Sequence, residues 1–127
     1  MMKTIKIGGV ILLLAGLLAI MLSGYAALIS LSVAIEGSMA GFYVGIAFSL
    51  VSLVAGIVGI VNRNKTNRES VLYVFIAAGA AIVALIIWEI VYFLSLGGID
   101  YVNIIISLVP HGLLIFGAVL NMEKGAA

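Results

Sequence analysis

The chain contains no cysteine and few charged residues. Of its 127 residues, 9% are Asp, Glu, Lys or Arg, one is proline and one is histidine. Without cysteine there can be no disulfide, thiolate metal site or thiol nucleophile. A single histidine with scattered carboxylates does not supply the three or four ligands of a metal site, so we expect no metal and no other cofactor. An ordinary soluble domain, in which about a quarter of the residues are charged, is also excluded.

Apolar residues make up most of what is present. They are 65% of the chain, and the mean hydropathy is +1.41. This composition indicates an integral membrane protein. Four spans of about 20 residues with short connections take up the whole length. We therefore predict a single transmembrane domain, residues 1–127, that is all-α and forms a four-helix bundle.

A polar run, residues 62–69, divides the apolar chain into two halves. Each half is long enough to cross a bilayer twice, so both halves must begin and end on the side where this basic run lies. The prediction is two helical hairpins. Their helices are expected at about 5–35, 41–61, 70–96 and 101–120.

The first apolar run follows Lys3 and Lys6, as the apolar core of a secretory signal would. A signal core is about 7 to 15 residues long, whereas this run continues to Ile35 and would extend roughly 40 Å as a helix. We expect it to be retained as the first span.

Basic residues lie on one side of the predicted spans only, and the opposite turns offer Glu36 and Asp100. The six basic residues are Lys3, Lys6, Arg63, Lys65, Arg68 and Lys124. The positive-inside rule then predicts a multi-pass protein of the cytoplasmic membrane with both termini cytoplasmic. The three in the middle loop are expected to set this topology and touch anionic headgroups, with no role in nucleic-acid binding.

Small residues recur along one face of the second span at spacings of three and four. They are Gly41, Gly45, Ser49, Ser52, Gly56 and Gly59. A looser counterpart in the first span is Gly16, Ala19, Ser23, Ala27, Ser30 and Ala34. Association of helices in lipid depends on close backbone approach, which such faces allow. We expect the first two helices to pack tightly as a hairpin.

Glu89 and His111 are, tyrosines aside, the only ionisable side chains well inside a span. At 1.5 Å per residue they lie about 12 and about 15 Å from the outer ends of their helices, and so at similar depth. Asn103 and Ser107 share a face of the fourth helix with His111. With Tyr25 and Ser49 nearby, these residues predict a polar site in the outer half of the bundle, with Glu89 and His111 in direct or water-bridged reach.

The same residues admit three interpretations. Glu89 and His111 could hydrogen-bond to each other and to neighbouring hydroxyls, and so only determine which helices pair. Glu89 could be a site for a proton or cation, with His111 responding to its occupancy. Alternatively, its carboxyl could reach the membrane interface beside Trp88 and Tyr92. A serine-hydrolase set lacks the Gly-x-Ser-x-Gly turn that would present Ser107, so we expect no enzyme.

The glycine-rich spans, the basic middle loop and the closing segment from Pro110 through residues 117–121 (Gly-Ala-Val-Leu-Asn) resemble the small four-span membrane proteins of unknown function from Gram-positive bacteria. This resemblance covers the whole chain and implies no known site. The small multidrug transporters are similar in length and number of spans, but their essential glutamate lies in the first helix. Here that helix has no glutamate before Glu36, at its end.

Two functions remain as hypotheses. The first is a non-enzymatic protein that binds another membrane component, as an accessory subunit or an immunity-type protector. The alternative is an oligomeric small transporter or channel with a polar layer at Glu89 and His111, since four short spans can hardly enclose a path alone. The expected partners are the lipid bilayer and either another membrane protein or further copies of the chain.

Overall fold

The computed structural model describes the backbone of residues 2–65, 67–99 and 101–126, and the side chains of 7–65, 67–99 and 101–121. In these ranges the chain is helical and has no strand. The four helices are α1 (Met2–Ile35), α2 (Met39–Val61), α3 (Arg68–Leu96) and α4 (Tyr101–Ala126). Each contains a segment long and apolar enough to span a membrane. The prediction of an all-α chain with four helices long and apolar enough to span a membrane is confirmed.

Local chemistry explains where the helices end. Ser38 caps α2, where its hydroxyl oxygen accepts the amide hydrogen of Gly41 at 3.0 Å. Gly97 ends α3 in the left-handed conformation, with φ 78°, that glycine adopts without steric cost. α4 continues to Ala126, beyond the predicted end at 120, because polar residues end the apolar part of a span without breaking the helix.

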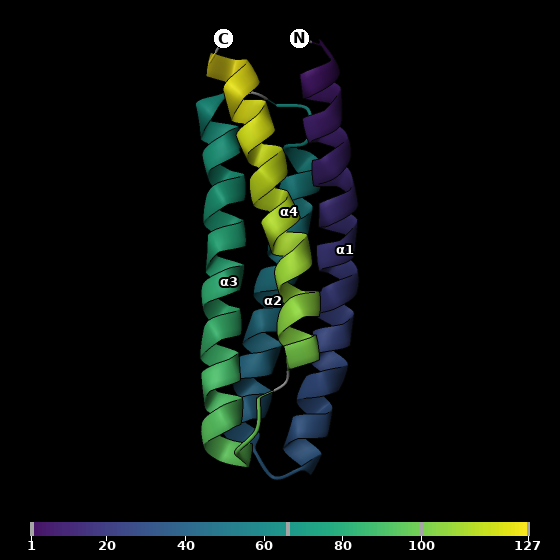
Figure 1. Ribbon diagram of the computed structural model, residues 1–127. Coiled ribbons are helices and arrows are strands. Elements are labelled where there is room, and N and C mark those ends of the chain that lie inside the picture. The colour runs from purple at the N-terminus through teal and green to yellow at the C-terminus, as the bar shows by residue number, and fades with distance from the viewer. Residues whose placement is uncertain (1, 66, 100, 127) are drawn as a thin grey trace.

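The helices form a bundle in which each lies beside two others. α1 contacts α2 and α4, and α3 contacts α2 and α4. Both termini and the α2–α3 connection lie at one end of the bundle (Figure 1). We call it the basic end because Arg63, Lys65 and Arg68 lie there. The side chains of Lys3, Lys6 and Lys124, and all of Asp100, lie outside the described residues.

The contact between α1 and α2 is the most extensive of the four. All six small residues of the predicted α2 face are buried. At the closest approach, a Cβ added to Gly56 would lie 2.6 Å from the Gly16 carbonyl oxygen, and one added to Gly16 would lie 2.7 Å from the Gly56 oxygen. The two backbones therefore touch where neither residue has a side chain.

The contact between α3 and α4 is the least extensive of the four. Large side chains, among them Leu85, Ile86, Ile104 and Leu108, lie along this boundary. They hold the two backbones apart toward the end opposite the basic end, where the two helices diverge (Figure 1). This separation positions the candidate site.

Candidate functional site

His111 lies at the centre of the bundle and is fully buried. Its Nδ1 is 2.8 Å from the carbonyl oxygen of Ser107, one turn earlier in α4. A carbonyl oxygen only accepts, so Nδ1 carries the proton in the neutral ring. Nε2 is 3.2 Å from the Ser52 hydroxyl of α2, and the ring also packs edge-on against Phe48, with centroids 5.8 Å apart.

Ser52 connects three helices through one hydroxyl group. Besides facing His111, its Oγ lies 2.9 Å from the carbonyl oxygen of Ala19 in α1. The hydroxyl has one proton and two acceptors within reach, namely this carbonyl and the unprotonated Nε2 of the neutral His111 ring. Ser52 lies where α2 meets α1 and α4, and because it can donate to only one of them at a time, it hydrogen-bonds to one of the two.

Ser49 has a related role one turn away from Ser52. Its hydroxyl donates to the carbonyl oxygen of Ser23 in α1 at 2.6 Å, while the Ser23 hydroxyl donates to Ile20 within α1, also at 2.6 Å. The serines of the α2 face thus hydrogen-bond to the backbone of α1. Ser49 is a helix-pairing residue, in agreement with its place in the small-residue face.

Glu89 of α3 is half-buried and pairs with the start of α4. The Asn103 side-chain amide donates to its Oε1 at 2.7 Å. The Ser107 hydroxyl faces the Asn103 Oδ1 at 3.5 Å, the longest link of the set. Glu89, Asn103, Ser107, His111 and Ser52 therefore form one polar chain that runs from α3 through α4 to α2.

Glu89 and His111 are thus connected through Asn103 and Ser107, and the link to His111 is the Ser107 backbone carbonyl. The Nε2 of His111 faces Ser52 and its Nδ1 faces the Ser107 carbonyl, so the direct contact does not form, and the water-bridged contact stays a prediction. Asn103 lies two turns, about 12 Å, from His111 along α4, and it is Asn103 that meets Glu89. The estimate of depth from helix ends missed this because it neglects helix tilt and the direction of each side chain.

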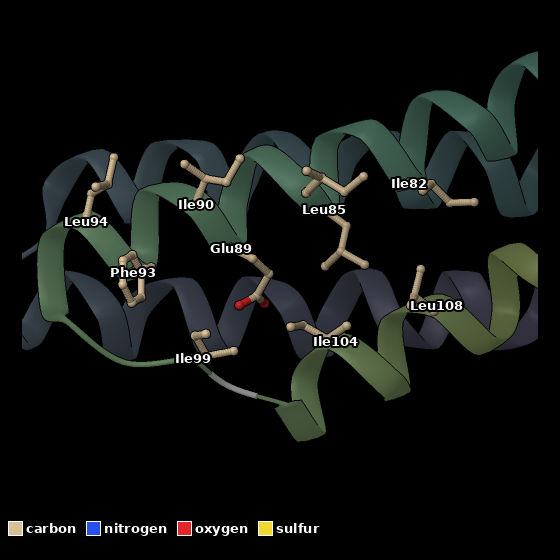
Figure 2. Close-up of a pocket in the computed structure, with 10 residues that line it drawn as sticks. Ile82, Leu85, Glu89, Ile90, Phe93, Leu94, Ile99, Ile104 and Leu108 are labelled. Atoms are coloured by element: carbon tan, nitrogen blue, oxygen red, sulfur yellow. The ribbon is translucent and has the colours of Figure 1, made fainter.

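A groove of about 460 Å³ lies between α3 and α4, and its surface is almost entirely apolar. Glu89 is one of the residues that line it, with the Oε2 of its carboxyl buried. Figure 2 shows the Glu89 side chain projecting from α3 into the space between the two helices, toward Ile99 and Ile104. Glu89 is the only polar side chain among the described residues that line this groove. The others are Ile82, Leu85, Ile86, Ile90, Phe93, Leu94, Ile99, Ile104 and Leu108. Several of these, such as Ile90 and Phe93, are exposed, so the groove opens on the outer face of the bundle.

Two aromatic residues lie where the sequence analysis did not expect them. Tyr25 is exposed on α1 beside Val109 and Pro110 of α4, outside the polar chain. Trp88 is buried in the core, where it stacks on Phe48 with centroids 5.5 Å apart, rather than lying at the membrane interface. Among the described residues its Nε1 has no hydrogen-bond partner, and it lies 2.8 Å from where a Gly45 Cβ would be.

Sequence reasoning also missed Asn121, a buried residue near the basic end. Its side-chain amide donates to the carbonyl oxygens of Arg63 at 3.1 Å and Lys65 at 3.4 Å, and so ties α4 to the α2–α3 connection. Its position could have been predicted from its spacing of three and seven residues from the buried Ala118 and Leu114, which places all three on one face of α4. In the connection itself, the Arg63 guanidinium donates to Ile60 at 2.8 Å, while Lys65 and Arg68 are exposed.

No protein-family model, curated protein sequence or solved structure matches this chain.

Proposed function

We propose that the protein binds another membrane component without catalysing a reaction, as an accessory subunit or an immunity-type protector. It does so as a multi-pass protein of the cytoplasmic membrane with both termini in the cytoplasm. The basic side chains of Arg63, Lys65 and Arg68 at the end that holds both termini support this orientation through the positive-inside rule. The whole-chain resemblance to small four-span proteins of Gram-positive bacteria is consistent with this location.

The observation that carries the proposal is an apolar groove, beside the half-buried Glu89, that opens on the outer face of the bundle. An acidic side chain at the centre of a spanning helix costs about 3 kcal/mol on insertion scales. A bundle built only for stability would place a leucine there. An ionisable residue at this depth is therefore a functional candidate by default.

The absence of catalysis is supported by the placement of the one serine–histidine pair. Ser52 and His111 have the spacing of a nucleophile and a base, at 3.2 Å. Both side chains are fully buried, and neither lines the α3–α4 groove. A substrate would have to separate the helices to reach them, so we assign the pair to helix association.

Gentle solubilisation from the native membrane tests the proposal, by identifying what co-purifies with the full-length chain. We expect a specific membrane component with the wild type and its loss with Ile90→Phe, which fills the groove. Leu28→Phe is the matched control, since it changes an exposed residue at similar depth on α1, and it should retain the component. Repeated isolation of the wild type with no specific component would refute the proposal.

An oligomeric transporter or channel is the second candidate, favoured by the polar chain from Glu89 to Ser52. The Asn103 amide interrupts that chain as a proton path, because a carboxamide does not pass protons as a hydroxyl does. Protein reconstituted in liposomes should move protons or a cation if this candidate is correct, and Glu89→Gln should stop the flux. Equal leakage of wild type and variant would eliminate it.

A further inference from the structure

The contacts of α4 change in kind at Pro110. After it, Leu114 is buried in the core, and Asn121 ties α4 to the α2–α3 connection. Gly117 lies close to α1, since a Cβ added to it would be 2.9 Å from the Leu12 Cγ. The half of α4 toward the basic end is therefore held by close packing and hydrogen bonds.

The half of α4 before Pro110, which we call the outer arm (residues 101–109), is packed less closely. The two side chains that it buries, Asn103 and Ser107, are polar, and it contributes no apolar side chain to the buried core. A groove lies on each side of it. One, of about 460 Å³, separates the arm from α3, and the other, of about 430 Å³, separates it from α1 beside Tyr25. Neighbouring side chains therefore do not fix the arm from either side.

Pro110 is the point about which such an arm would turn. Proline has no amide hydrogen, so the Ile106 carbonyl lacks the helical donor that another residue at 110 would supply, and helices bend at such points. α4 nevertheless remains helical on both sides of Pro110, so the arm can tilt as one segment. At its other end, a Cβ added to Gly97 or Gly98 would meet nothing within 4 Å. Packing at these two residues does not restrain the arm.

A short hydrogen bond ties the arm to α3. The Asn103 amide donates to the Oε1 of Glu89 at 2.7 Å, whereas the contact of Asn103 with Ser107 inside the arm is 3.5 Å long. A hydrogen bond between membrane helices is weak, of the order of thermal energy, so it can break and form again.

We propose that the outer arm of α4 pivots at Pro110 between α3 and α1, so that one groove widens as the other narrows, and that the Asn103–Glu89 hydrogen bond holds the arm toward α3. This inference goes beyond the proposed function, because the movement occurs whether or not a component binds. The position of the arm sets the width of the α3–α4 groove that a component would meet.

Pairs of spin labels measure this movement, because the chain has no cysteine of its own and introduced cysteines alone are labelled. The outer pair, Leu28→Cys with Val102→Cys, joins α1 to the outer arm. The control pair, Leu14→Cys with Phe116→Cys, joins α1 to the half of α4 after Pro110. All four residues are exposed. The full chain is reconstituted in liposomes, and pulsed electron paramagnetic resonance gives the distribution of distances within each pair.

We expect the distribution of the outer pair to be roughly twice as wide as that of the control pair, since the proline removes a restraint on the arm alone. Pro110→Ala restores the amide hydrogen for Ile106 and should narrow the outer pair to about the width of the control pair. Asn103→Leu removes the hydrogen bond to Glu89 and should shift the outer pair to shorter distances, as the arm moves toward α1. An unchanged control pair shows that each variant has kept its fold.

An outer pair as narrow as the control pair in the otherwise unchanged chain would overturn the inference, by showing that Pro110 sets a fixed bend. An outer pair that stays equally wide in Pro110→Ala would also overturn it. The labels occupy the same positions in both proteins, so the width would then come from the labels rather than from a hinge. An unchanged outer distance in Asn103→Leu would contradict the role given to the hydrogen bond with Glu89. None of these results depends on the co-purification experiment, so the proposed function is tested separately.

Discussion

The α1–α2 and α3–α4 interfaces are built from opposite kinds of side chain. Between α1 and α2, glycine, alanine and serine let the backbones touch, as at Gly16 and Gly56, and serine hydroxyls donate to carbonyls of the facing helix. Between α3 and α4, isoleucine, leucine and phenylalanine hold the helices apart and leave an apolar groove beside Glu89.

This difference follows from what drives helix association in lipid. Apolar side chains gain nothing by leaving lipid for protein, so helix association depends on close packing and hydrogen bonds. The α1–α2 interface satisfies both requirements within the chain. The α3–α4 interface satisfies neither fully, and it is there that we propose another molecule binds.

The largest expected effect on stability is at the backbone contact between Gly16 of α1 and Gly56 of α2. Gly56→Ala adds a Cβ 2.6 Å from the Gly16 carbonyl oxygen, and overpacking of this kind costs about 1 to 3 kcal/mol. Gly79→Ala on α3 is the control, because nothing lies within 4 Å of its added Cβ. Thermal unfolding in detergent should show a lower midpoint for the first variant only. Equal midpoints would show that the α1–α2 contact is not close-packed.

A smaller effect is expected from the polar chain. A double-mutant cycle with Ser52→Ala and His111→Phe should give a coupling of about 0.6 kcal/mol, the average for hydrogen bonds between membrane helices. The cycle with Glu89→Gln and His111→Phe should give less, because two side chains separate these residues. Denaturation in mixed micelles measures both. A larger coupling in the second cycle would contradict the connection through Asn103.

The smallest expected effect on stability is at Glu89 itself. Glu89→Gln keeps an oxygen that accepts from Asn103, so the free energy of unfolding should fall by less than it does in Gly56→Ala. A large loss of stability in the same denaturation assay would make Glu89 a structural residue and remove the contrast between the two interfaces.

Particular residues show what could be read before the fold was known. The α2 face from Gly41 to Gly59 was recognisable because small residues stand out at helical spacing against a background of leucine and isoleucine. The inward face of Asn103, Ser107 and His111 was recognisable for the same reason, since polar side chains in a span turn away from lipid. All three are buried.

For residues that do not stand out from their neighbours in this way, the sequence predicted the wrong environment. Trp88 was expected near the interface and lies in the core, whereas Tyr25 was grouped with the polar site and faces outward. In a helix that is apolar all round, the sequence does not specify which side faces protein, because lipid and protein interior are equally apolar solvents for it.

The sequence by itself determined that the chain forms four helices long and apolar enough to span a membrane, because length, hydropathy and the scarcity of charge depend on no contact between helices. Only the tertiary structure decided that Glu89 pairs with Asn103, that His111 pairs with Ser52, and that a groove lies between α3 and α4. Each of these depends on how the helices rotate and tilt against one another. That arrangement is set by the sum of many close contacts among residues far apart in the chain.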